Sequence, residues 1–136
     1  MAQNMTFAIN TESPIAVYMQ IENQVQFAIA SGQLKPGDRV PAVREMSEML
    51  KTNPNTIAKA YRDLQVMQLV HTRRGVGVTI SDKAPKLCRA NVRQLVTSHL
   101  TDAVAECTAG GLSKNDILGI VESAITSGCK PYESQC

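Results

Sequence analysis

The stretch VREMSEMLKTNPNTIAKAYRDL, residues 43–64, decides the fold of this chain. Its apolar residues recur at helical spacing on both sides of a tight polar turn. They are Val43, Met46, Met49 and Leu50 before the turn, and Ile57, Ala60, Tyr61 and Leu64 after it. Asn53 and Pro54 suit the N-cap and the first position of the second helix. Two short helices joined so closely predict a helix-turn-helix, whose second helix enters the major groove of DNA.

The chain before this stretch predicts a longer helix over residues 14–31. Ser13 and Pro14 are expected to form its cap and first turn, and Gly32 its left-handed stop. The apolar stripe of this helix consists of Tyr18, Ile21, Val25, Ala28 and Ile29.

The chain after residue 64 predicts a β-hairpin. The runs Leu69–Arg73 and Val76–Ile80 are rich in β-prone residues and flank Arg74 and Gly75. Earlier in the chain, Lys35–Asp38 is typical of a turn, and Arg39 and Val40 form at most a stub of strand. Three helices followed by a hairpin predict a winged helix-turn-helix.

Two further helices are expected in the tail. The first, from about Pro85 to Cys107, carries an apolar band that is too wide for one neighbouring helix to cover. The second has Ser113 as its N-cap, Asp116 to complete a capping box, and Gly128 as its end. Because no third helix follows to cover this apolar surface, the tail predicts association with a second copy of the chain.

The expected fold class is therefore α+β and mainly α, with a winged helix-turn-helix DNA-binding domain followed by a two-helix dimerisation tail. We place an N-terminal arm at residues 1–13, the winged helix-turn-helix at 14–82 and the tail at 83–136. Within the arm, Phe7 and Ile9 alternate with polar or small residues, which predicts an extended segment.

Charge is unevenly distributed along the 136 residues, although the net charge is only +2. Residues 1–34 carry two acidic and no basic residues, residues 35–93 carry 12 basic and 5 acidic residues, and residues 94–136 carry 2 basic and 5 acidic residues. A basic middle is expected where a chain meets a polyanion. No apolar run is long enough for a membrane helix and no signal peptide is evident, so we expect a cytoplasmic protein without a membrane partner.

Motifs for catalysis are missing from the sequence. There is no P-loop, no nucleophile elbow and no H-E-x-x-H metal motif, so we expect neither an enzyme nor a bound cofactor or metal. The four cysteines contain no C-x-x-C pair and are expected to be free thiols. His99 lies on the apolar band of the tail and is expected to be a partly buried structural residue.

The segment from Pro14 to Ile80 resembles the N-terminal domain of GntR-family bacterial transcription regulators. The stretches that carry the likeness are PIAVYMQI at 14–21, GQLKPGDRVP at 32–41, VREM at 43–46, NPNTI at 53–57 and RRGVG at 73–77. Only 56 residues follow Ile80, and the chain is similar to the short-tailed YtrA group of this family. Pro54 and Ala58 stand where other branches carry arginine, so DNA contacts of those branches are not carried over at these positions. Ala42 stands where a capping serine is common, and the helix after it is expected to fray.

Nine residues are expected to meet DNA. They are Arg44, Asn53, Asn55, Thr56, Lys59, Arg62, Arg73, Arg74 and Gly75. Asn55 and Thr56 lie at the exposed start of the second helix of the motif, within reach of base edges or phosphates. Lys59 is expected to bind phosphate, and a smaller contribution is expected from Arg62, which lies farther from the end that enters the groove.

The remaining contacts lie outside that helix. The resemblance assigns a DNA-contacting role to Arg44, whose alternative is a local ion pair with Glu48. Arg73, Arg74 and Gly75 would bring the wing to the minor groove, with glycine allowing close approach of the backbone.

These features predict a homodimeric transcription regulator that binds double-stranded DNA, acts as a repressor and recognises an inverted-repeat operator. The resemblance to the YtrA group implies control of neighbouring transporter genes. Two alternatives stay open: a regulator that responds to a small molecule at the dimer interface or to oxidation of a thiol, and a winged-helix module for protein interaction. A thiol sensor would need a reactive thiolate near positive charge, which Cys88 offers beside Lys86 and Arg89.

Overall fold

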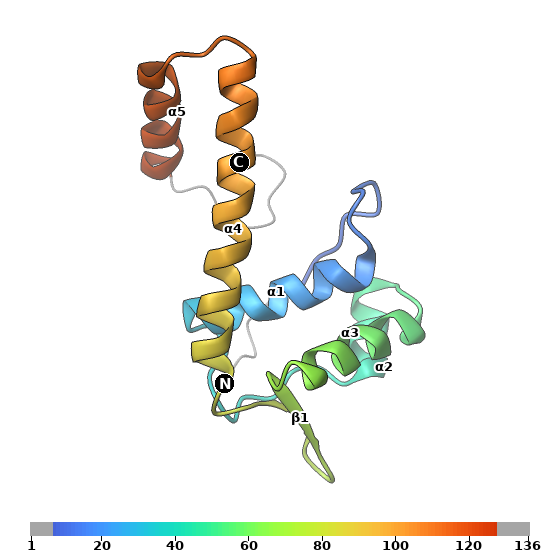
Figure 1. The fold of residues 1–136 in the computed structure, drawn as a ribbon. Coiled ribbons are helices and arrows are strands. Elements are labelled where there is room, and N and C mark those ends of the chain that lie inside the picture. The colour runs from blue at the N-terminus through green and yellow to red at the C-terminus, as the bar shows by residue number, and fades with distance from the viewer. Residues whose placement is uncertain (1–6, 128–136) are drawn as a thin grey trace. The chain divides into compact units, whose positions relative to one another are not determined.

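The computed structural model describes residues 7–127. In chain order, its elements are α1 (Val17–Ser31), α2 (Val43–Leu50), α3 (Pro54–Val66), β1 (Val70–Arg73), β2 (Gly77–Ile80), α4 (Ala84–Ala109) and α5 (Lys114–Thr126), as Figure 1 shows. Over the described residues the protein is mainly helical, with a two-stranded antiparallel sheet. The predicted fold class is confirmed. The chain divides into two compact units, Met1–Arg93 and Gln94–Cys136, which are described separately below.

The helix-turn-helix forms as the sequence predicts. Asn53 caps α3 by accepting a hydrogen bond from the Asn55 amide at 2.8 Å, and Pro54 is the first helical residue. The four predicted apolar residues of α3 are all buried, namely Ile57, Ala60, Tyr61 and Leu64. The hydroxyl of Tyr61 donates to the carbonyl of Pro41 at 2.5 Å and thereby ties the entry of α2 to α3.

Helix α2 is buried along a narrower stripe than predicted. Met46 is fully buried, Val43 and Leu50 are partly buried, and Met49 is 53% exposed. The prediction for Met49 is wrong because α2 packs on the core of its unit along one edge only.

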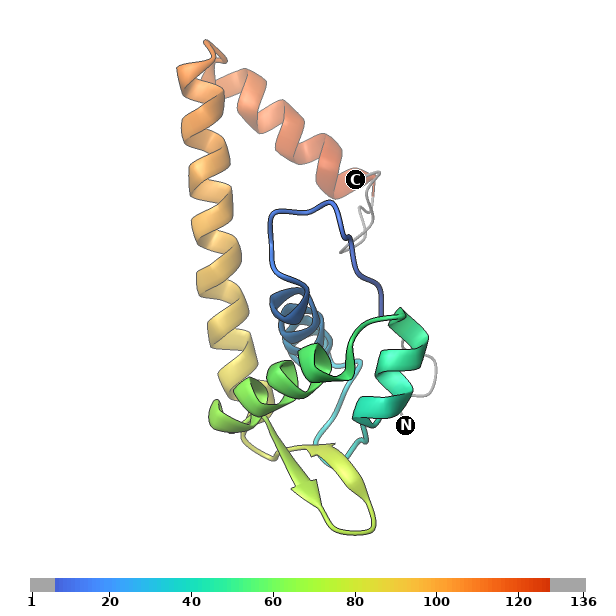
Figure 2. The same ribbon diagram turned by 90° about the vertical axis from the view of Figure 1, so that its right-hand side faces the viewer.

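Helix α1 lies beside α3, as Figures 1 and 2 show, and contributes Ile21, Val25, Ala28 and Ile29 to the core. It begins at Val17, later than predicted, because Ser13 accepts a hydrogen bond from the amide of Ile15 at 3.1 Å within a turn that precedes the helix. The N-cap is Ala16, which makes no side-chain cap, so the prediction for Ser13 and Pro14 is wrong. Gly32 ends the helix with a φ of 89°, as predicted.

The arm is held by two glutamine side chains of α1. The amide of Ala8 donates to Gln24 Oε1 at 3.0 Å, and Gln24 Nε2 donates back to the carbonyl of Ala8. The amide of Asn10 similarly donates to Gln20 Oε1 at 2.8 Å. Phe7 is buried in the core, so the described part of the arm, from residue 7 onward, packs as part of the first unit.

The wing consists of β1 and β2 paired in antiparallel register from Val70 opposite Ile80 to Arg73 opposite Gly77. The predicted stub of strand is present, since Arg39 forms a bridge with Thr79 and the amide of Val40 donates to the carbonyl of Val78 at 3.0 Å. Figure 2 shows the hairpin projecting beyond the three helices of the same unit.

The first unit includes the beginning of α4, because Ala84 and Cys88 are buried in its core and Asn91 donates to Gln26 of α1 at 3.1 Å. Within the second unit, the predicted capping box of α5 is present. The Ser113 amide donates to Asp116 Oδ2 at 3.0 Å and the Asp116 amide donates to Ser113 Oγ at 3.2 Å. These bonds lower the pKa of Asp116.

Side chains of the tail helices are largely exposed. No residue of α5 is buried, and His99 is exposed, contrary to the prediction, because nothing in the described chain covers that part of α4. The predicted helix end at Gly128 lies outside the described residues. Among the helices of residues 7–127, none is both long and apolar enough to cross a membrane.

The start of α2 offers a test of the local capping. Ala42 has no oxygen with which to cap the helix, and Glu45 Oε1 accepts only a long hydrogen bond of 3.4 Å from the Ala42 amide. The Ala42→Ser substitution should supply the missing acceptor and raise the free energy of unfolding by about 1 kcal/mol in urea denaturation. Ala90→Ser, at an exposed position inside α4, should give no gain, because serine in a helix interior is less favourable than alanine. Equal effects of the two substitutions would contradict the capping argument.

Candidate nucleic-acid interface

The first turn of α3 presents short polar side chains to solvent. Asn53 and Asn55 are exposed and Thr56 is half-buried. The side-chain oxygen of Asn53 accepts the hydrogen bond that caps α3, which leaves its side-chain amide nitrogen as a donor. Within the described chain, the side chain of Asn55 makes no hydrogen bond and keeps both a donor and an acceptor for a base edge.

Arg62 lies on the same side of α3 as Asn55, two turns farther along the helix. Its side chain is exposed, and it forms no ion pair among residues 7–127. Arg62 is therefore a free cation of the recognition helix.

Lys59 is held by neighbouring side chains. Its ammonium group lies 3.4 Å from Asp63 Oδ2 and 4.5 Å from the centre of the Tyr18 ring on α1. A cation in contact with a carboxylate and an aromatic face has less to gain from a phosphate than a free one. Sequence reasoning missed both partners. The spacing of Lys59 and Asp63 by four residues on one helix was the available signal for the ion pair, whereas no local signal pointed to Tyr18.

Arg44 lies exposed in the first turn of α2. The ion pair with Glu48 that sequence reasoning kept as an alternative does not form, and within the described residues Arg44 has no acidic partner. Its guanidinium group is available for a bidentate contact with phosphate or guanine.

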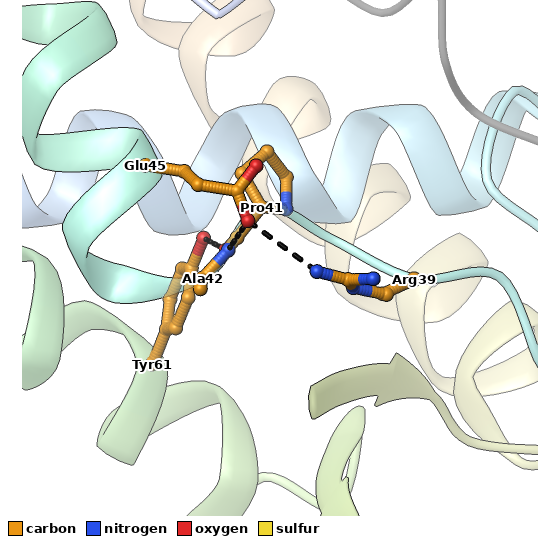
Figure 3. Close-up of polar contacts among 5 residues, drawn as sticks. All are labelled: Arg39, Pro41, Ala42, Glu45 and Tyr61. Carbon is orange, nitrogen blue, oxygen red and sulfur yellow. Dashed lines mark hydrogen bonds and ion pairs between the residues drawn. The ribbon is translucent and has the colours of Figure 1, made fainter. Parts of the chain in front are cut away.

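Arg39, a cation that sequence reasoning did not single out, lies against Glu45 in the first turn of α2. Arg39 Nη2 lies 3.4 Å from Glu45 Oε1. Figure 3 shows this ion pair beside the hydrogen bond between Tyr61 and Pro41. Burial, followed by the negative charge of Glu45, raises the pKa of Tyr61. Arg39 also lies along the backbone of the wing, because a Cβ placed on Gly77 would be 3.5 Å from Arg39 Nε. The available signal for this position was a basic residue in the predicted strand stub itself.

The tip of the wing carries two adjacent exposed arginines. Arg73 Nε donates to His71 Nε2 at 3.3 Å, whereas Arg74 makes no hydrogen bond or ion pair in the described part of the chain. Gly75 has a φ of 82°, a conformation that side chains rarely adopt, and nothing lies within 4 Å of the place where a Cβ would be. The hairpin thus turns tightly and leaves open space at its tip for a narrow groove.

Cys88 cannot act as the reactive thiol that one alternative requires. Its side chain is fully buried, and this burial raises its pKa to about 11. Lys86 and Arg89 are exposed neighbours in sequence that do not lower this pKa. A thiol sensor based on Cys88 is therefore contradicted by the packing of α4. Among the described residues, no group of three or more histidine, cysteine or acidic side chains is placed to hold a metal ion.

A helix-turn-helix with an exposed polar start of its second helix, followed by a wing with an arginine tip, defines a DNA-binding transcription regulator. Residues 17–80 match the family model described as bacterial regulatory proteins of the gntR family. The chain is also 31% identical over 122 residues to the uncharacterised HTH-type transcriptional regulator YhcF of Bacillus subtilis, covering 89% of this chain and 93% of the relative. It therefore belongs to the GntR family, as its sequence motifs predict.

Other relatives agree with this assignment. The HTH-type transcriptional repressor YtrA of B. subtilis is 31% identical over 104 residues, which cover 76% of this chain and 80% of the repressor. A GntR-family regulator from Listeria monocytogenes has a similar structure, with a TM-score of 0.67, 25% identity and coverage of 85% of this chain and 98% of that one. YtrA from Sulfolobus acidocaldarius is similar at a TM-score of 0.53 and 26% identity, over 88% of this chain and 96% of that one. The predicted likeness to the YtrA group is confirmed, and these relatives are regulators rather than enzymes.

The environment of Cys88 gives a chemical test. In native protein treated with iodoacetamide at pH 8, we expect the half-buried Cys107 to be alkylated much faster than Cys88, because only a small fraction of a thiol with a pKa of about 11 is ionised at that pH. Peptide mass spectrometry resolves the two sites, and urea-unfolded protein is the control in which both should react. Rapid native labelling of Cys88 would restore the thiol-sensor alternative.

Proposed function

We propose that this protein is a homodimeric repressor that binds an inverted-repeat operator in double-stranded DNA. The observation that carries the proposal is the set of exposed side chains without acidic partners on the helix-turn-helix and the wing, of which Arg44, Arg62 and Arg74 are cations. The helix-turn-helix and the wing, which belong to the same unit, present these side chains. Each of the two elements is known to enter a DNA groove. Because its target would be chromosomal DNA, we propose that the protein acts in the cytoplasm.

The nine predicted residues divide between reading bases and binding the backbone. Where α3 enters the major groove, base edges would be read by Asn55, Thr56 and Arg44. Asn53 would donate a hydrogen bond to a nearby phosphate or base. Arg62 and Lys59 would bind phosphates, and the free guanidinium of Arg62 would contribute more than the paired ammonium of Lys59. Arg73, Arg74 and Gly75 would enter the minor groove.

Exposed apolar side chains of the tail support dimerisation. Leu100 on α4 is 56% exposed, and Ile120 and Ile125 on α5 are 55% and 74% exposed. Apolar surface of this extent on both tail helices is expected to be covered in the working protein. A second copy of the same tail offers a matching surface, and it would pair two DNA-binding domains for the two halves of an inverted repeat.

Regulation by occlusion of a promoter follows from this arrangement. The related B. subtilis YtrA is named a transcriptional repressor. The resemblance to the YtrA group implies transporter genes as the targets of the regulator that we propose. As the site of a small-molecule effector we propose the dimer interface, where two subunits together would form the pocket.

The direct test is selection of bound sequences from a random double-stranded DNA pool by purified protein at about 150 mM salt, where nonspecific contacts are weakened. We expect enrichment of an inverted repeat. A folded dimer that enriches no sequence and shows no salt-dependent DNA affinity would instead support the second candidate, a winged-helix module for protein interaction.

Two substitutions separate base reading from phosphate binding on the selected sequence. Asn55→Ala should weaken binding by about 1–3 kcal/mol and relax the preference at one base position of each half-site. Arg62→Ala should weaken binding to all sequences and reduce the salt slope by about 1 per subunit. Lys114→Ala removes the same charge from α5, outside the winged-helix unit, and should leave both properties unchanged.

The dimer is tested by placing charge on the apolar face of α4. Leu100→Lys should weaken dimerisation by about tenfold or more, because a buried ammonium would replace a buried apolar side chain. Analytical ultracentrifugation measures this change against the 14.8 kDa chain. Ser98→Lys adds the same charge on the opposite side of the helix and should leave a dimer intact. If Leu100→Lys left dimerisation unchanged, this result would contradict the proposal that the tail forms the dimer interface.

A further inference from the structure

Arg39 stands on a backbone that is firmly tied to the wing. The Ile80 amide donates to the carbonyl of Asp38 at 2.9 Å, and the Val40 amide donates to the carbonyl of Val78 at 3.0 Å, so both neighbours of Arg39 are hydrogen-bonded to β2. Val40 is buried in the core, whereas the side chain of Arg39 is 58% exposed. The strand stub therefore fixes the backbone of Arg39 and directs its side chain to solvent.

The side chain of Arg39 lies between two elements to which we assign DNA contacts. A Cβ placed on Gly77 of β2 would be 3.5 Å from Arg39 Nε and 4.0 Å from Arg39 Cδ, so the side chain runs close to the backbone of the wing. Its Nη2 atom lies 3.4 Å from Glu45 Oε1 in the first turn of α2, the ion pair drawn in Figure 3. The guanidinium group is thus placed between the wing and the start of α2.

Most N–H donors of this guanidinium group are unused. Within the described residues, the side chain of Arg39 makes one hydrogen bond, which is the contact with Glu45. This contact is long and exposed, and such pairs hold their partners weakly. Lys59 differs, because its ammonium group lies against both a carboxylate and an aromatic ring. Arg39 therefore keeps donors with which it can bind a phosphate.

We propose that Arg39 binds a backbone phosphate of the operator, where the DNA strand passes between the groove that α3 enters and the groove that the wing enters. The inference rests on the proposed function, because it needs the helix-turn-helix in the major groove and the wing in the adjacent minor groove. A line of phosphates separates two adjacent grooves of a duplex, so a cation held between the two elements faces these phosphates. Glu45 would orient the guanidinium group in the free protein and compete with the phosphate for it.

Ethylation interference on the selected operator tests this placement. An ethyl group removes the negative charge of a phosphate, so ethylated DNA is depleted from the bound fraction wherever the protein needs that phosphate. In each half-site, wild-type protein should show interference at a phosphate between the bases that α3 contacts and the minor groove that the wing contacts. Arg39→Gln should lose interference at that phosphate and keep it at the others. Arg89→Gln removes the same charge from an exposed position on α4 and should keep the whole wild-type pattern.

Binding titrations over a range of salt concentrations give a second readout. Arg39→Gln should weaken binding by about tenfold at about 150 mM salt and reduce the salt slope by about 1 per subunit. Arg39→Lys keeps the charge but not the forked geometry, so it should retain most of the slope and lose only part of the affinity. Glu45→Gln keeps an acceptor for the Ala42 amide and removes the competing charge, so it should strengthen binding by about two- to fivefold.

Urea denaturation of Arg39→Gln should match wild type, because the substituted side chain is exposed. If Arg39→Gln weakened binding without changing the salt slope or the interference pattern, Arg39 would only brace the wing against α2, and the inference would be wrong. Wild-type affinity in Arg39→Gln would overturn it as well. The proposed function fails separately: in that case wild-type protein itself would bind no DNA, and the inference would fail with it.

Discussion

The packing of α3 against α1 is the contact on which the rest of the DNA-binding unit depends. One face of α3 packs into the core through Ile57, Ala60, Tyr61 and Leu64. Asn55 and Arg62 therefore lie on the opposite face. The hydroxyl of Tyr61 then fixes Pro41, and with it the start of α2 and the position of Arg44. The strand stub at Arg39 and Val40 joins the same segment to β2, so the wing is anchored to the helices through a few residues before α2. One helical face therefore positions all the elements to which we assign contacts with DNA.

Sequence reasoning succeeded where the signal was local. The cap at Asn53, the turn at Gly32, the hairpin around Gly75 and the capping box of Ser113 with Asp116 each depend on residues within a few positions of one another, and the structure has all of them. Helix periodicity likewise placed α2 at its observed bounds, because one apolar stripe is enough to define a short helix.

The features that it missed depend on contacts between distant segments. The arm finds its partners in Gln20 and Gln24, polar residues on α1 that no periodicity argument treats as buried. Cys88 lies beside basic residues in sequence, yet the start of α4 packs into the core, and this burial raises the pKa of the thiol. The sequence predicts Lys59 as the main phosphate contact on α3. In the structure its ammonium group lies over the ring of Tyr18, which is distant in sequence. These three cases share one physical reason, namely that burial and pairing are set by tertiary neighbours rather than by the local pattern.

In the function that we propose, the two units have different tasks. The first unit would read DNA with its exposed polar and basic side chains. The apolar faces of the tail would bind a second copy of the chain, which would set the distance between the two DNA-binding domains. Hydroxyl-radical footprinting of the protein on its selected operator tests this central claim most directly. Our account predicts two symmetric protected half-sites whose centres are separated by a multiple of about 10 base pairs. A single asymmetric protected segment, from protein shown to be dimeric, would contradict it.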